Sequence, residues 1–216
     1  MRTIRTRATI SHLSKRATSK FFAFFFAHFY PRLEPGAVRD WRRGLVARAS
    51  GRVLEIGVGP GLNLPLYPSG VELFGLDPNP AMLRHARRRA RGLGREVTLV
   101  RAEAEAISLP AGFFDTVVSI FTFCSVRRPD AAAREIYRVL RPGGRLLFME
   151  HVRSAHPAWA RLQRAVAPAW SLCAGGCRLD RDTLGYFLDA GFVLEPVARA
   201  GGGILPVVRG VALKRD

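Results

Sequence analysis

The sequence contains few cysteines and no apolar run long enough to cross a membrane. Only 3 of the 216 residues are cysteine, and such a sparse, odd set favours a reducing compartment and implies no disulfide framework. The aromatic-rich block at Phe21–Tyr30 ends at Pro31, whereas a transmembrane helix needs about 20 apolar residues. We therefore expect a cytoplasmic protein.

Acidic residues are also scarce. The chain has 17 aspartates and glutamates against 34 lysines and arginines, which gives a formal charge of +17. One interpretation is a basic face that attracts nucleic acid or an anionic membrane. The other is arginine solvated on helix surfaces. Charge alone therefore identifies no partner, although peripheral contact with an anionic membrane stays open.

The composition otherwise fits one globular domain, with 48% hydrophobic and 24% charged residues. We expect a basic leader and an aromatic N-terminal helix over residues 1–36, followed by one domain over residues 37–216. The basic start is also compatible with an organellar transit peptide or with an arm on a membrane surface.

The hydrophobic pattern alternates between short apolar runs and helical stretches. The runs at 52–56, 72–76, 97–100, 116–120 and 145–150 predict strands, and 37–49, 80–92, 129–140 and 182–190 predict helices. Runs at 193–197 and 207–214 flank three glycines and predict a closing antiparallel hairpin. Because the earlier runs are mostly continuous apolar stretches rather than alternating ones, they are typical of a parallel sheet covered on both faces. The pattern predicts an α/β fold, a Rossmann-like, doubly wound seven-stranded sheet with a C-terminal antiparallel hairpin and helices on both faces.

A glycine-rich turn follows the first predicted strand, at Gly57, Gly59 and Gly61. Glycine lets the main chain approach a ligand without Cβ collisions. The spacing is G-x-G-x-G rather than the G-x-G-x-x-G of dinucleotide sites, and Glu55 before it would repel a diphosphate. Asp77 ends the next predicted strand, where a carboxylate can accept hydrogen bonds from two ribose hydroxyls. The pair suits a nucleoside ligand with a positively charged amino acid portion.

With these residues the chain resembles the class I S-adenosylmethionine-dependent methyltransferases, from about residue 52 to the C-terminus. Segments 76–80, 103–105, 114–118 and 140–146 match later motifs of that class in order. The resemblance implies S-adenosyl-L-methionine as cofactor. The cofactor-binding residues that it implies are Glu55, Gly57, Gly59, Gly61, Asp77, Pro78, Met82, Glu103, Ala104, Phe121 and Thr122, with Leu83 beside Met82 near the adenine faces.

Within the class, segments 123–126, 150–152 and 170–183 are similar to the alkylthiol S-methyltransferases of animals and their bacterial relatives. The likeness is limited to the C-terminal half. The animal proteins have a longer hydrophobic anchor where this chain has its basic leader and aromatic block.

Candidate acceptor-site residues lie at the carboxyl ends of the later strands. His151, directly after the fifth predicted strand, is the candidate general base for a thiol acceptor; alternatively it is a strand-end residue bonded to the backbone. Cys124, Trp170 and Cys177 are candidates to line the acceptor pocket, or are ordinary buried residues. No metal site is expected, because Cys173 and Cys177 have no further Cys/His pair at zinc-ligand spacing.

Taken together, these patterns predict a methyltransferase acting on a small-molecule acceptor, with a thiol as first choice. A phospholipid amine or quinone acceptor is the alternative, and a non-catalytic basic module that binds membrane or nucleic acid is a third interpretation. Nucleic acid is disfavoured as a substrate because no Asn/Asp-Pro-Pro-Tyr/Phe motif and no RNA-binding module is present. The sequence does not indicate an oligomeric state.

Overall fold

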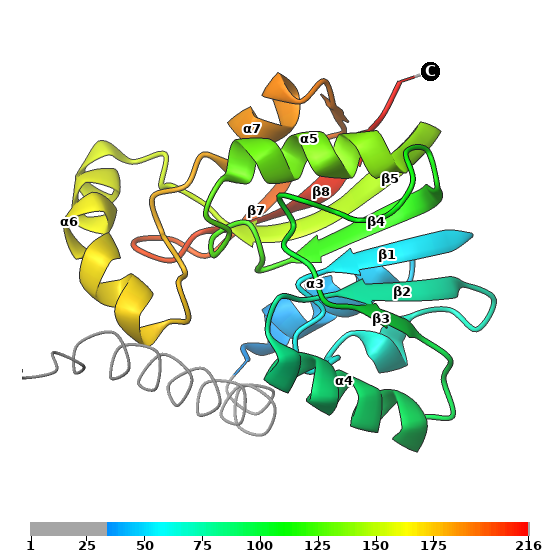
Figure 1. Ribbon diagram of the computed structural model, residues 1–216. Helices are drawn as coiled ribbons and strands as arrows, with labels where there is room; N and C mark the ends of the chain where they lie inside the picture. Colours follow the sequence, from blue (N-terminus) through cyan, green and yellow to red (C-terminus); the bar gives the residue numbers. More distant parts are fainter. Residues whose placement is uncertain (1–33, 216) are drawn as a thin grey trace, which may run out of the picture.

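The computed structural model describes residues 34–215 (Figure 1). The predicted leader and aromatic helix at 1–36 therefore lie outside the described residues, except for the last three. Within residues 34–215, no helix is both long and apolar enough to span a bilayer.

One mixed sheet of eight strands forms the centre of the molecule. Its strands are β1 (Arg52–Ile56), β2 (Glu72–Leu76), β3 (Thr98–Val100), β4 (Phe114–Ile120), β5 (Leu140–His151), β6 (Val193–Leu194), β7 (Ala198–Ala200) and β8 (Val207–Leu213). The order is β3-β2-β1-β4-β5-β8-β6, with β7 also paired to β8. Strands β1 to β5 are parallel, and β8 runs antiparallel to β5, β6 and β7. The predicted doubly wound sheet with an antiparallel C-terminal part is confirmed.

Helices cover both faces of this sheet (Figure 1). The elements are α3 (Gly36–Val46), the short 3₁₀ helix η1 (Leu64–Leu66), α4 (Pro80–Gly92), α5 (Pro129–Val139), α6 (Pro157–Cys173) and α7 (Thr183–Asp189). Leu45 of α3 and Leu83 of α4 belong to one buried cluster. Ile136 of α5 and Phe187 of α7 belong to the other. The sheet is therefore buried on both sides, as its mostly apolar, non-alternating strands predict.

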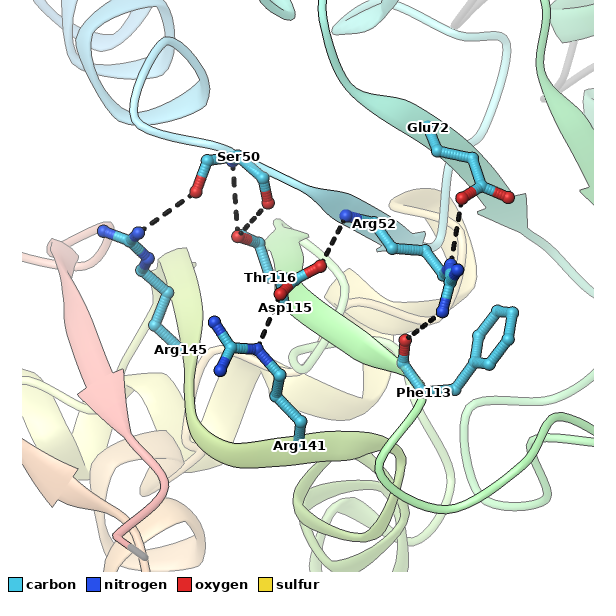
Figure 2. Close-up of polar contacts among 8 residues, drawn as sticks. All are labelled: Ser50, Arg52, Glu72, Phe113, Asp115, Thr116, Arg141 and Arg145. Carbon is cyan, nitrogen blue, oxygen red and sulfur yellow. Dashed lines mark hydrogen bonds and ion pairs between the residues drawn. The ribbon is translucent and has the colours of Figure 1, made fainter.

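The amino ends of the central strands are held together by Asp115, the first polar residue of β4 (Figure 2). Its carboxylate accepts hydrogen bonds from the backbone N–H of Arg52 at 2.7 Å and from the Arg141 guanidinium at 2.6 Å. Arg52 also pairs with Glu72 at 2.9 Å. The Arg52 N–H, followed by Arg141, holds the pKa of Asp115 below its usual value. These bonds link the starts of β1, β2, β4 and β5, so the opposite edge carries their carboxyl ends.

Two details of the C-terminal half differ from the sequence expectations. Strand β5 already begins at Leu140, because Leu140 pairs with Phe114 before the register shifts around the Pro142–Gly144 turn. Of the run expected at 193–197, only Val193–Leu194 forms a strand, β6, and an unexpected strand, β7, follows at Ala198–Ala200; both pair with β8. The sheet thus has eight strands, of which seven lie on its main path.

Helix α6 follows β5 and lies to one side of the layered core (Figure 1). Of its side chains, Trp159, Leu162 and Trp170 are 43%, 42% and 37% exposed. Trp170, for which an ordinary buried position was the alternative to lining the acceptor pocket, is therefore exposed. Among the side chains of α6 that the structure describes, Gln163 and Ala167 alone are fully buried.

Candidate active site

The strand order reverses between β1 and β4, which are neighbours although two strands separate them in sequence. In open α/β sheets, the loops leaving adjacent strands at such a point diverge to opposite faces and open a crevice at the carboxyl ends. The glycine turn leaves β1 there, and the turn at 121–123 leaves β4. The fold thus defines a Rossmann-like α/β protein with its candidate ligand site at this edge.

The three glycines of the turn differ in their surroundings. A Cβ on Gly57, whose φ is +62°, would come within 2.4 Å of the Thr122 hydroxyl, and one on Gly61 within 2.6 Å of the Leu64 side chain. These two positions pack against protein. At Gly59, by contrast, a Cβ would meet only a backbone oxygen at 3.8 Å. Gly59 is therefore the position where the turn leaves space for a ligand.

Glu55 lies beneath this turn and is 2% exposed. The Asn63 amide donates to one of its carboxylate oxygens at 2.7 Å, and the Tyr67 hydroxyl donates to the other at 2.8 Å. Burial raises the pKa of Glu55 to about 7, and the hydrogen bonds from Tyr67 and Asn63 only partly oppose it. In this arrangement Glu55 anchors the segment after the glycine turn.

Arg42 of α3 is a buried residue of this region that the sequence analysis missed. Its guanidinium pairs with Glu34 and donates to the side-chain amide oxygen of Asn63, Oδ1, at 2.8 Å. The same group lies over the Phe121 ring, 5.7 Å from its centroid. The available signal was a charged side chain four residues after Val38 and three before Leu45, on the apolar stripe of the predicted helix. Arg42 thus connects α3 to both turns of the site.

Asp77 closes the same crevice from the end of β2. Its carboxylate accepts the Gly59 N–H at 3.0 Å on one oxygen and the Asn79 N–H at 2.8 Å on the other. Burial raises its pKa to about 6, and these two hydrogen bonds partly offset the effect. An ionised carboxylate has about four acceptor positions, so each oxygen keeps one for a ligand.

The other predicted cofactor residues follow the same edge. Glu103, after β3, is near enough to Asp77 for its charge to raise the Asp77 pKa. Met82 and Ala104 are buried, at 6% and 4% exposure, while Pro78 is exposed. Leu83 was expected beside the adenine, but it packs into the sheet-covering cluster with α3. We see no ligand-facing role for it.

The turn after β4 is organised by Glu150, a second buried residue that was not assigned a role from sequence. Its carboxylate accepts the Ser119 hydroxyl at 2.6 Å and the N–H groups of Thr122 and Phe123 at 3.0 and 3.1 Å. Burial raises the pKa of Glu150 to about 7, although these three hydrogen bonds act to lower it. Phe121 takes a positive φ of 54°, a conformation that non-glycine residues adopt only when their surroundings impose it.

His151, Cys124 and Cys177 meet beside this turn. The His151 ring stacks on Phe121 with centroids 4.5 Å apart. One nitrogen of His151 and the two cysteine sulfurs lie within 4.8 Å of one another. Both cysteines are buried and free. The structure therefore brings together three of the four predicted acceptor-site residues, from segments far apart in sequence.

The fourth predicted residue, Trp170 of α6, interacts with Cys177. The pKa of Cys177 is lowered to about 5, chiefly by the Cys124 thiol and also by His151 and the Trp170 indole, while burial opposes the shift. The pKa of Cys124 is raised well above its usual value by the same contact and by burial. Of the two thiols, Cys177 is thus the one that ionises first.

A groove next to α6 accounts for part of the basic surface. It is lined by Arg153, Arg161, Arg164, Arg181 and Arg199, together with Asp182 and several small residues. This places positive charge beside the acceptor region. Contact with an anionic membrane stays a prediction.

Comparison with known proteins places the chain in a family. A family model described as a methyltransferase domain matches residues 54–148. The chain is 32% identical over 203 residues to the ubiquinone/menaquinone biosynthesis C-methyltransferase UbiE of Yersinia pestis, covering 81% of both chains. It superposes on an S-adenosylmethionine-dependent methyltransferase of Mesorhizobium loti with a TM-score of 0.64 at 21% identity, over 83% of this chain and 98% of the other. The chain belongs to the class I S-adenosylmethionine-dependent methyltransferases, as the sequence resemblance implied.

Another relative is the human thiol S-methyltransferase TMT1B, which is 39% identical over 141 residues, 62% of this chain. The chain spans 58% of the length of TMT1B. The family is thus established, whereas the acceptor differs between the named relatives.

We predict that Arg42→Met lowers the free energy of unfolding by about 3 kcal/mol, because it removes one partner of a buried ion pair with Glu34 and the hydrogen bond to the Asn63 side chain. Urea denaturation measures this change. Arg43→Met, on the exposed side of the same helix, is the matched control and should shift stability by less than about 0.5 kcal/mol. Equal effects of the two substitutions would contradict the role given to Arg42.

Proposed function

We propose that this protein transfers a methyl group from S-adenosylmethionine to a small thiol. The observation that carries the proposal is the open space at Gly59 beside the buried Asp77 carboxylate. At this point a ligand can approach the main chain, and each oxygen of the Asp77 carboxylate has one position left to accept a hydrogen bond.

The residues of the crevice fit the cofactor. Each oxygen of Asp77 already accepts one N–H and can accept one ribose hydroxyl. Glu55 and Asp77 lie close enough for the charge of one to raise the pKa of the other. Two carboxyl groups at one end of a basic protein favour a positively charged ligand there. Glu55 would act through the segment that it anchors, since Asn63 and Tyr67 bind its oxygens.

S-adenosylmethionine supplies a methyl carbon on a positively charged sulfur. The acceptor sulfur forms the new C–S bond to this carbon, and the old C–S bond breaks with its electron pair left on the donor sulfur. The proton of the thiol is released. The protein's part is to hold donor and acceptor in line and to exclude water. Thr122 fixes the turn beside the donor, because its hydroxyl donates to the Ile56 carbonyl oxygen at 3.1 Å. Its backbone N–H donates to Glu150.

A thiol acceptor is supported by the group at the far side of this turn. Cys124 and Cys177 pack in an apolar cluster with Leu179 and Val166, the ligand atoms of Cys124, His151 and Cys177 lie within 4.8 Å of one another, and Trp170 is close enough to Cys177 to lower its pKa. A relative named thiol S-methyltransferase agrees with this choice, while UbiE is named for quinone biosynthesis and keeps the quinone alternative open. His151 stays the predicted base, since a thiol reacts as its thiolate.

We predict that Asp77→Asn weakens S-adenosylmethionine binding by about 10- to 100-fold, because the ribose loses hydrogen bonds to a charged acceptor. In the unsubstituted protein, the proton on Asp77 competes with the ligand below its pKa of about 6. The affinity should therefore be level above pH 7 and about tenfold weaker at pH 5. Isothermal titration calorimetry across this range measures both effects.

Asp115→Asn, at the opposite edge of the sheet, is the control and should leave the dissociation constant unchanged. The Asp77→Asn protein should also show a flatter pH profile, with the remaining slope due to Glu55. Undiminished binding by Asp77→Asn would remove the ribose assignment and, with it, the proposed cofactor site.

We predict that the purified protein transfers label from S-adenosylmethionine to small alkyl thiols and gives methyl thioethers. A panel of thiols, quinones, phospholipid amines and RNA, analysed by mass spectrometry, tests the acceptor. Turnover of a quinone or a lipid amine without any thiol product would overturn the thiol proposal while leaving the methyltransferase proposal intact.

A further inference from the structure

The group formed by Cys124, His151 and Cys177, here called the Cys–His cluster, has the composition of a metal site. Its members come from the turn after β4, the end of β5 and the loop after α6. Their ligand atoms lie within 4.8 Å of one another. Adjacent ligand atoms of a tetrahedral zinc ion are about 3.8 Å apart, given Zn–S bonds of about 2.3 Å. The ligand atoms are therefore at most about 1 Å farther apart than those of a closed zinc site.

The main chain holds the two cysteines at this separation. The Arg178 N–H donates to the Cys124 carbonyl oxygen at 2.7 Å, which ties the loop after α6 to the turn after β4. Gly175 and Gly176, with φ of 62° and 91°, form the bend that precedes Cys177. Positive φ at both positions favours glycine, so the bend is a specific feature of this loop. Neither cysteine depends on the metal for its place in the fold.

The His151 side chain supplies a second, independent observation. Its Nδ1 atom is buried and has no hydrogen-bond partner within residues 34–215. Buried polar atoms are nearly always paired, and an exception calls for an ion or a ligand. Stacking on Phe121 fixes the plane of the ring. The imidazole is thus oriented, and one of its nitrogens is available.

We propose that Cys124, His151 and Cys177 bind one Zn²⁺ ion through two thiolates and one imidazole nitrogen, and that the fourth position takes the acceptor thiol. The second half of this proposal rests on the proposed function. Three protein ligands with an open fourth position are the pattern of catalytic zinc sites, whereas structural sites use four. Two thiolates and a neutral imidazole also cancel the charge of the ion, which suits the apolar surroundings of Leu179 and Val166.

Binding at the fourth position would activate the acceptor. The thiol loses its proton to solvent as its sulfur bonds to the zinc ion, so that one proton is released for each thiol bound. Zinc stabilises the thiolate form, which removes the need for a separate base. His151 then acts as a zinc ligand rather than as the predicted general base. Trp170, at the rim next to Cys177, is placed to contact the organic part of the acceptor.

The metal site is tested by zinc content and by Co²⁺ spectroscopy on the full-length protein. Mass spectrometry of protein purified without chelator should give about one zinc per chain. After removal of zinc, one equivalent of Co²⁺ should give thiolate-to-cobalt charge-transfer absorption in the near ultraviolet and the strong visible bands of a four-coordinate ion. Addition of ethanethiol should then strengthen the charge-transfer band and shift the visible bands, because a third sulfur enters.

Cys124→Ser, Cys177→Ser and His151→Ala should each weaken Co²⁺ binding at least 100-fold. His156→Gln, which replaces an exposed histidine at the start of α6, is the matched control and should bind as the unsubstituted protein does. Circular dichroism and S-adenosylmethionine binding establish that each variant is folded. Less than a tenth of an equivalent of zinc, together with no cobalt absorption from the folded, reduced protein, would overturn the metal site.

The outcomes separate the two proposals. Thiol methylation by metal-free protein at an undiminished rate would overturn the zinc proposal and leave the proposed function standing. A normal cobalt spectrum that does not respond to ethanethiol, in a protein that methylates no thiol, would leave the metal site standing and overturn the thiol acceptor.

Discussion

The buried carboxylate of Glu150 is the interaction on which both halves of the candidate site depend. It accepts the Ser119 hydroxyl and two successive N–H groups, from Thr122 and Phe123. Those bonds close the turn after β4 and hold Phe121 at a positive φ. On one side of the turn, Thr122 packs against Gly57 of the glycine turn. On the other, Phe121 stacks on His151.

This arrangement brings the proposed cofactor site and the Cys–His cluster to adjacent points of one sheet edge. The carboxyl ends of β1 and β2 carry the acids and the open glycine of the proposed cofactor site, and those of β4 and β5 carry the Cys–His cluster. Because the four strands are parallel, all of these groups lie at one edge, while Asp115 and its partners fasten the other. Because the strands are parallel, their direction alone determines which edge carries the candidate site and which edge carries the Asp115 hydrogen bonds.

Most of the fold could be predicted from the sequence because its signals are local. Strands β1 and β2 and helix α4 have the predicted boundaries. Each strand is mostly apolar, and α4 begins at Pro80 directly after Asn79, whose side chain caps the helix by accepting the Ala81 N–H. Strand β7 was missed because Ala198–Ala200 has no β-branched or aromatic residue. Its pairing depends on β8, which is distant in sequence.

The site could be predicted only where a motif is contiguous. The glycine turn and Asp77 follow strand ends and are visible in sequence. By contrast, the partners of Glu55 appear only when the segment after the glycine turn folds back onto it, and the bond from Arg42 to Asn63 appears only when α3 packs against that segment. The Cys–His cluster escaped notice for the same reason. Its members are 27 and 26 positions apart, and the expectation of no metal site weighed only ligands close in sequence.

We propose above all that the methyl donor binds in the crevice between the glycine turn and the turn after β4, which is hydrogen-bonded to Glu150. A crystal structure with S-adenosylhomocysteine tests it most directly. The account predicts ribose hydroxyls on Asp77, the ligand main body beside Gly59, and Phe121 still at a positive φ. A ligand bound elsewhere would contradict this proposal. So would a rearranged turn after β4 in which Glu150 no longer accepts hydrogen bonds from that turn.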